Sequence, residues 1–155
     1  MAPIMLFSTW GQAMTKSITV RGFIRMFPDD DACLKYLLKE RYGPKFECPR
    51  CGKIRTLYRL SKRTAYSCQC GKHVYPMVGT PFFRTHVPLQ KWFYAMYLFT
   101  STQRGVSANE LQRQLGVRFK TASRMANEIR KYLAFVDSDS KHSAKAAIQS
   151  NKRKG

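Results

Sequence analysis

Two closely spaced pairs of cysteines constrain the fold of this chain more than any other feature. They are Cys48 and Cys51, with two residues between them, and Cys68 and Cys70, with one. Glycine follows each pair directly, which lets the backbone turn so that its amides face the sulfurs. Four thiolates spaced in this way complete the tetrahedron that Zn²⁺ prefers, so the sequence predicts one zinc ion per chain.

Two residues compete for the position of the fourth ligand. The second pair has one residue between its cysteines rather than the commoner two, and His73 lies shortly after it. We favour Cys70, because Gly71 follows it as Gly52 follows Cys51. Four thiolates leave no open position for water, so we expect a structural metal rather than a catalytic one. Four buried or reactive thiols without a metal are the less favoured alternative.

A helix is predicted immediately before the cysteine pairs. The segment Phe27–Asp31 places acids at a helix start, where carboxylates cap the chain and complement the positive end of the helix dipole. Gly43, followed by proline, ends this helix. The fifth cysteine, Cys33, shares an apolar stripe with Leu37, so we expect it to be a core residue.

A helix-turn-helix pattern occupies residues 107–131. Ser107 caps its first helix, and Gly116 makes the turn. An aromatic-rich helix from 88 to about 102 is predicted before it, and the final helix is predicted from about 119 to 135. Helices at these offsets are typical of DNA-binding proteins.

The expected fold class is α+β, with a small three-stranded zinc ribbon, an N-terminal helix and a helix-turn-helix module. Short alternating segments predict the strands within 56–60, 64–67 and 73–75. The predicted divisions are a flexible extension at 1–26, the N-terminal helix at 27–44, the zinc ribbon at 45–86, the helix-turn-helix module at 87–136 and a disordered basic tail at 137–155.

The second helix of the pattern leaves a polar outer stripe that suits DNA. Arg124 can pair with guanine and Asn127 with adenine in the major groove, whereas Lys120 is better placed for phosphate. Basic residues of the ribbon hairpin offer a second phosphate contact. The predicted DNA contacts are Lys120, Thr121, Ser123, Arg124, Asn127 and Lys131 on the helix and Arg55, Arg59, Lys62 and Arg63 on the ribbon. An ordinary solvated face of a helical hairpin is the alternative.

The overall charge favours DNA as the partner. Lys and Arg number 28 against 9 acids among 155 residues, which gives a net charge of +19. Such an excess fits a polyanion. The sequence contains neither a basic amphipathic helix suited to a lipid surface nor an apolar run as long as a membrane span. We therefore expect a soluble chain without a membrane partner, held in a reducing compartment.

The order of these motifs resembles the N-terminal part of zinc-ribbon insertion-sequence transposases related to the ISXO group. The resemblance covers roughly residues 27–133 and rests on CPRCG at 48–52, LQKWF at 89–93 and LGVRFKTA at 115–122. It implies that this portion binds the terminal repeats of a bacterial mobile element, in the cytoplasm at the nucleoid. It also implies that a separate downstream domain cuts and joins DNA with Mg²⁺.

The sequence departs from this family pattern most clearly after residue 137, where no room is left for an RNase H-like catalytic domain. We therefore expect a truncated transposase portion that is not an enzyme alone. The acids fit other roles, because Asp29–Asp31 start a helix and Glu110 fits a capping box. Arg118 and Ser123 replace a small capping residue and an aromatic, which we expect to loosen the recognition helix or to change its target.

Two further functions compete with that of a transposase portion. A stand-alone zinc-containing transcriptional regulator would use the same DNA contacts, and a protein-binding zinc adaptor would use none of them. The expected partners are double-stranded DNA together with either a second copy of this chain, as a homodimer, or a separately encoded catalytic subunit.

Overall fold

The computed structural model describes residues 18–102 and 104–152, with their side chains as far as 138 except for 136. Within these residues the chain divides into two compact units, 18–93 and 94–152. The division falls inside helix α4 (Leu89–Ser101), a little later than the boundary between 86 and 87 that we expected from the sequence.

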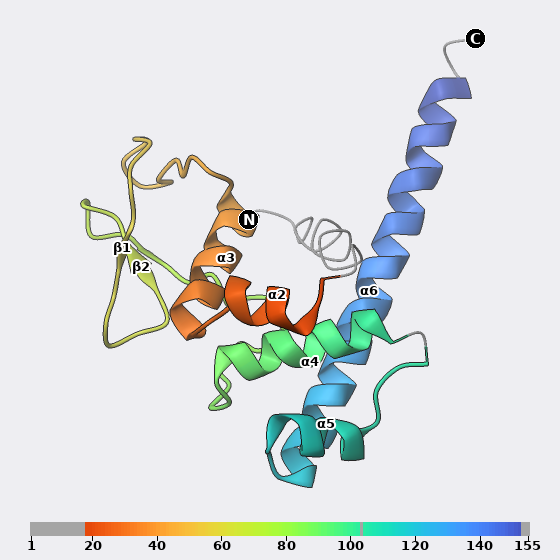
Figure 1. Cartoon of the computed structure of the whole chain (residues 1–155). Helices are drawn as coiled ribbons and strands as arrows, with labels where there is room; N and C mark the ends of the chain where they lie inside the picture. Colours follow the sequence, from red (N-terminus) through yellow and green to blue (C-terminus); the bar gives the residue numbers. More distant parts are fainter. Residues whose placement is uncertain (1–17, 103, 153–155) are drawn as a thin grey trace. The chain divides into compact units, whose positions relative to one another are not determined.

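Helix α3 (Asp30–Tyr42), drawn in orange in Figure 1, is the longest helix that lies wholly within the first unit. Asp29 caps it as predicted, since its side chain accepts a hydrogen bond from the N–H of Ala32 at 2.7 Å. Gly43 ends it with a φ of 74°. The buried side of α3 includes Cys33, which confirms that this cysteine is a core residue.

Aromatic side chains fill the core beside α3. The ring of Phe27 is fully buried, and its centroid lies 5.2 Å from that of Tyr36 and 4.9 Å from that of Phe93. The ring of Phe82 lies 5.9 Å from Phe93. Edge-to-face and tilted pairs at such distances contribute about 0.5–1.5 kcal/mol beyond their burial. This cluster therefore holds α3 against the first turn of α4.

The ribbon sheet is three-stranded and antiparallel in the order β1-β2-β3, as predicted. Its strands are only two residues long: Tyr58–Arg59 (β1), Tyr66–Ser67 (β2) and His73–Val74 (β3). They are shorter than predicted because turn hydrogen bonds replace the ladder next to them, such as that from the N–H of Cys68 to the carbonyl of Lys72 at 2.8 Å. So small a sheet needs further support to be stable.

The second unit packs α5 (Ala108–Leu115) against α6 (Phe119–Lys152), and Figure 1 shows the two helices side by side. Ser107 caps α5 by accepting a hydrogen bond from the N–H of Glu110 at 3.1 Å. The carboxylate of Glu110 does not complete the predicted capping box and instead accepts from two side chains of α5. Gly116 makes the turn with a φ of 62°. The fully buried side chains of the two helices are Leu111, Ala122, Met125, Ala126 and Ile129.

The expectation of a flexible extension at 1–26 is corrected at its C-terminal end. Residues 20–26 form helix α2 (Val20–Met26), while residues 1–17 lie outside the described part of the chain. The side chain of Thr19 accepts a hydrogen bond from the N–H of Gly22 at 3.2 Å, and Phe23 is buried. A threonine cap and one buried aromatic side chain therefore stabilise this helix of about two turns.

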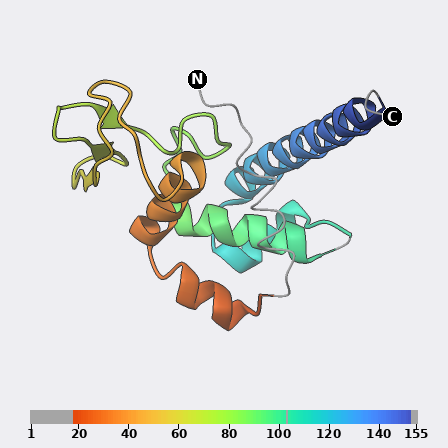
Figure 2. The ribbon, with the colours of Figure 1, turned by 90° about the horizontal axis from the view of Figure 1, so that it is seen from above.

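The expectation of a disordered tail is also corrected, because α6 continues through residues 137–152. Figure 2 shows it as one uninterrupted helix. This segment contains no Pro or Gly, and Ala144, Ala146 and Ala147 have high helix propensity. Across the described residues, no helix combines the length and the apolar character needed to cross a membrane.

Candidate metal centre and basic helix face

The four predicted zinc ligands come together at one point of the first unit. They are Cys48, Cys51, Cys68 and Cys70, and their Sγ atoms all lie within 4.8 Å of one another. Sulfurs of opposite knuckles are 3.6 Å apart in one pair and 3.9 Å apart in another. A tetrahedral site with Zn–S bonds of about 2.3 Å requires sulfurs about 3.8 Å apart. The cluster therefore has the spacing that zinc requires, and its residues fit the metal.

Two tight turns bring the sulfurs into this arrangement. The N–H of Gly52 donates to the carbonyl of Cys48 at 2.8 Å, and the N–H of Gly71 donates to the carbonyl of Cys68 at 2.9 Å. The φ angles of these glycines are 62° and 82°, and residues with a Cβ adopt such angles only at a cost in conformational energy. The glycine after each cysteine pair thus makes the tight turn that we expected from the sequence.

His73, the alternative fourth ligand, lies outside the cluster. It is exposed on β3, and its ring is directed along the strand toward Tyr75, 6.5 Å away between centroids. The structure brings Cys70 into the group of four instead.

Hydrogen bonding prepares Cys48 to bind a metal as the thiolate. The backbone N–H of Cys51 lowers the pKa of Cys48 to about 6, although burial acts in the opposite direction. Cys33 provides a contrast, because burial raises the pKa of its thiol to about 12. Since the thiolate is the form that binds metals, Cys48 suits a zinc site and Cys33 does not.

An apolar shell surrounds the sulfurs. Phe46 and Val74 are buried together with Cys48 and Cys68, and the half-buried Leu57 packs against them. The guanidinium of Arg50 donates to the carbonyl of Cys70 at 3.3 Å and links the two knuckles. A metal held by four thiolates within such a shell would cross-link the ribbon and would leave no coordination position for substrate.

The geometry of these residues agrees with a comparison to known families. Residues 28–73 match the family model of a transposase zinc-ribbon domain. The matched segment contains α3 and all four cysteines, and it covers less than half of the chain. No curated protein and no solved structure gives a match to the chain. The predicted zinc ribbon of the transposase type is thus confirmed for this segment.

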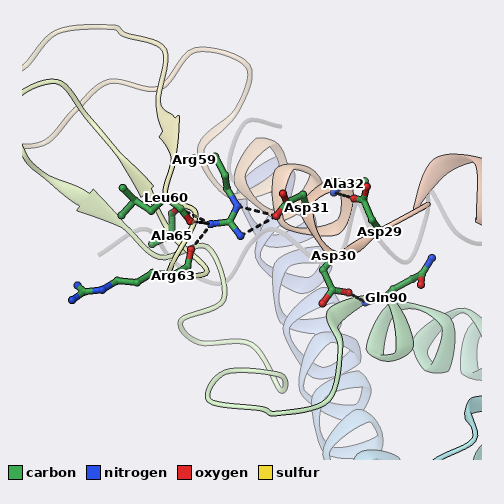
Figure 3. Close-up of polar contacts among 9 residues, drawn as sticks. All are labelled: Asp29, Asp30, Asp31, Ala32, Arg59, Leu60, Arg63, Ala65 and Gln90. Atoms are coloured by element: carbon green, nitrogen blue, oxygen red, sulfur yellow. Dashed lines mark hydrogen bonds and ion pairs between the residues drawn. The ribbon is translucent and has the colours of Figure 1, made fainter.

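Arg59, on strand β1 of the zinc-ribbon domain, contacts protein groups where we expected phosphate. Figure 3 shows its guanidinium between α3 and the turn that follows β1. It pairs with Asp31 at 2.9 Å and donates to the carbonyl oxygens of Leu60, Arg63 and Ala65. This one side chain therefore joins the hairpin to α3.

The other predicted ribbon contacts differ in their surroundings. Arg55 donates to the side-chain oxygen of Gln69. Lys62 and Arg63 lie in the turn between β1 and β2 with exposed side chains. Of the four predicted ribbon contacts these two are exposed, whereas Arg55 and Arg59 are half-buried.

Three consecutive aspartates of the zinc-ribbon domain have three different partners, as Figure 3 shows. Asp29 caps α3, whereas Asp30 accepts a hydrogen bond from the N–H of Gln90 at 2.8 Å, at the start of α4. Asp31 pairs with Arg59. The side chain of Gln90 donates in return to the carbonyl of Phe27 at 2.7 Å. Each of the three carboxylates therefore has a structural role.

A hollow of about 960 Å³ lies between α3 and residues 54–59, and we did not expect it from the sequence. Its apolar lining includes Phe46, Ile54 and Leu57. Lys35 and Lys39, one helical turn apart on α3, are the basic residues at its α3 side. Their spacing was visible in the sequence, but nothing in the sequence placed an apolar surface next to them.

Helix α6 presents the predicted DNA contacts on the side that is not buried against α5. Lys120 and Arg124 are exposed, and the side chain of neither forms a hydrogen bond or an ion pair with any described residue. Asn127 is exposed and accepts a hydrogen bond from Arg130 at 3.3 Å. Lys131 pairs with a glutamate one turn earlier at 3.1 Å. The remaining two, Thr121 and Ser123, are half-buried.

Arg130 has a structural role that we did not predict. Its guanidinium donates to the carbonyl of Val106 at 2.9 Å and lies 5.6 Å from the ring centroid of Phe99. It thereby fixes the segment before α5 to α6. No local sequence pattern indicates this contact, because the two partners are far apart in the chain.

Proposed function

We propose that this chain is the DNA-binding portion of a zinc-ribbon insertion-sequence transposase and recognises the terminal repeats of its element. In this proposal the α5–α6 pair acts as a helix-turn-helix, with α6 as the recognition helix. The match of residues 28–73 supports the link to transposases. One observation carries the DNA-binding part: α6 is buried against α5 on one side, while Lys120 and Arg124 are exposed without a protein partner on another.

The distribution of charge along the two helices supports this proposal. The first turn of α5 contains Glu110, whereas the first turn of α6 contains no acid. Instead, Arg118 lies directly before α6 and Lys120 lies in its first turn, at the positive end of the helix dipole. Cations in this position are unfavourable in an isolated helix and become favourable when phosphates lie alongside.

The zinc ribbon would supply a second, weaker contact. With one structural zinc ion per chain holding the knuckles, the exposed Lys62 and Arg63 remain candidate phosphate contacts. Arg59 is dropped from the proposed contacts, because its guanidinium is occupied by Asp31 and three carbonyl groups. We further propose that the described portion binds DNA without cutting it, since its three consecutive aspartates already have structural partners. Asp29 caps α3, Asp30 accepts a hydrogen bond from the N–H of Gln90, and Asp31 pairs with Arg59.

Salt-dependent binding of duplex DNA tests the proposal. Lys120→Ala is expected to weaken binding to all duplexes about equally and to reduce the slope of log K against log salt by about 1. Arg124→Ala is expected to cost about 1–3 kcal/mol at one base pair and to relax the preference there. Fluorescence anisotropy with the zinc-loaded full chain measures both effects over about 50–200 mM salt.

Arg113→Ala is the matched control, because Arg113 is an exposed arginine on α5 that already pairs with Glu110 at 2.6 Å. It is expected to leave base preference unchanged. If Lys120→Ala and Arg124→Ala both bind every duplex as the parent protein does, α6 is not the recognition helix.

A further inference from the structure

Phe119, the first residue of α6, is an exposed aromatic side chain in a basic setting. It is 52% exposed, whereas Met125 and Ile129, the next bulky apolar residues of the helix, are completely buried. Its neighbours in sequence, Arg118 and Lys120, are both exposed cations. The ring is therefore only partly covered by the core between α5 and α6. The ring and its two cationic neighbours together suit a partner that has both negative charges and an apolar group.

Helical spacing places Phe119 at the edge of the proposed DNA-binding face. Residues four apart lie above one another on a helix, so Phe119 and Ser123 form one row and Lys120 and Arg124 form the next. The fully buried row of Ala122 and Ala126 lies on the other side of Phe119. In helix-turn-helix proteins this N-terminal end of the second helix is the part that contacts base edges.

We infer that Phe119 reads thymine by packing its ring against the 5-methyl group in the major groove. The inference rests on the proposed function of α6. In the major groove the thymine methyl is the one apolar group that distinguishes base pairs, and the other groups there are hydrogen-bond donors and acceptors. An aromatic ring flanked by Arg118 and Lys120 matches a methyl group flanked by phosphates.

Replacing thymine by uracil tests this contact, because uracil lacks only the methyl group. The zinc-loaded full chain first selects binding sites from a pool of random duplexes. Each thymine of the selected site is then replaced singly by uracil, and affinities are measured for the parent protein and for Phe119→Ala. For the parent protein we expect one position to weaken about fourfold, the equivalent of about 0.8 kcal/mol for one buried methyl group. For Phe119→Ala we expect no effect of uracil at that position.

Phe135→Ala is the matched control, since Phe135 is a second exposed phenylalanine of α6, 44% exposed and outside the proposed face. It is expected to keep the parent's sensitivity to uracil. Circular dichroism and zinc content verify that each variant is folded.

The outcomes separate the inference from the proposed function. If the parent protein binds no duplex, the proposed function itself fails. If the parent binds but no thymine is sensitive to uracil, or if Phe119→Ala shows the same sensitivity, the thymine contact is wrong even though α6 binds DNA. Loss of affinity in Phe119→Ala without any uracil effect would assign the ring to sugar or protein contacts instead and would equally overturn the inference.

Discussion

The two units of this chain hold their folds by different means. The first has strands of two residues each, and its ribbon closes around four sulfurs. Two side chains then connect distant elements of this unit: Arg59 pairs with the carboxylate of Asp31, and Gln90 donates to the carbonyl of Phe27. The second unit buries a continuous apolar surface between α5 and α6. The comparison teaches that a segment with little regular structure depends on cross-links and polar contacts, whereas two packed helices depend mainly on the burial of apolar side chains.

Removing a zinc ligand is expected to have the largest effect and to be confined to the first unit. Cys68→Ser removes one of the four sulfurs, and structural zinc sites contribute on the order of 10 kcal/mol to folding. We expect the loss of one zinc equivalent per chain and fast hydrogen exchange over residues 45–76, with α5 and α6 still protected. A chromogenic chelator and exchange mass spectrometry measure these outcomes.

Two controls accompany Cys68→Ser. Cys33→Ala removes a buried thiol outside the cluster of four sulfurs. His73→Ala removes the residue that competed with Cys70 as fourth ligand and that also lies outside the cluster, so both variants are expected to retain zinc. Retention of a full equivalent of zinc by Cys68→Ser, or its loss from His73→Ala, would show that the ligand set is wrong.

A packing substitution in the second unit is expected to have an intermediate effect on stability. Unlike the loss of zinc, it should destabilise the second unit and leave the first unchanged. Leu111→Ala empties space in the completely buried surface between α5 and α6 and is expected to cost about 2–5 kcal/mol. Exchange should accelerate in α5 and α6, while zinc content stays at one equivalent. Gln112→Ala, at the exposed neighbouring position, should change stability by less than about 0.5 kcal/mol. Loss of zinc from Leu111→Ala would contradict the independence of the two stabilising mechanisms.

The smallest effect is expected for a single polar link of the first unit. Asp31→Asn breaks the ion pair with Arg59. The side chain of Arg59 is 28% exposed and that of Asp31 is 67% exposed, so we expect a cost of about 1 kcal/mol or less in stability. Amide exchange of the hairpin turn at 60–65 should report it. The control is Glu128→Gln, which breaks a more exposed pair on α6 and should cost still less. Equal effects of the two substitutions would show that the Arg59 link adds nothing beyond a surface pair.

Local patterns predicted the parts of the fold that depend on neighbouring residues. The cap at Asp29, the cap at Ser107, the turn at Gly116 and the two cysteine knuckles all involve groups within a few residues of one another. Each is fixed by the geometry of a short peptide, so the sequence is sufficient to identify it.

Contacts between distant residues were not predictable in this way. Nothing in the sequence around Asp30 or Gln90 indicates that they interact. The fold brings the N-terminus of α4 to the carboxylate of Asp30, which accepts a hydrogen bond from the N–H of Gln90. Arg59 illustrates the same limit, because its basic charge did not indicate that Asp31, far away in the sequence, would be its ion-pair partner. The extent of α6 was not predictable for another reason, since the basic residues after 137 favour disorder whereas the alanines among them favour a helix.

The position of Arg59 has a consequence for how such a ribbon can diversify. Its guanidinium bonds to backbone carbonyls of the hairpin turn, so the turn is held through groups that every residue possesses. The side chains at Ser61, Lys62 and Arg63 are exposed and are not needed for that support. Mutations at this tip are therefore expected to cost little in folding, so the charge and shape of the hairpin tip can change while its scaffold stays constant.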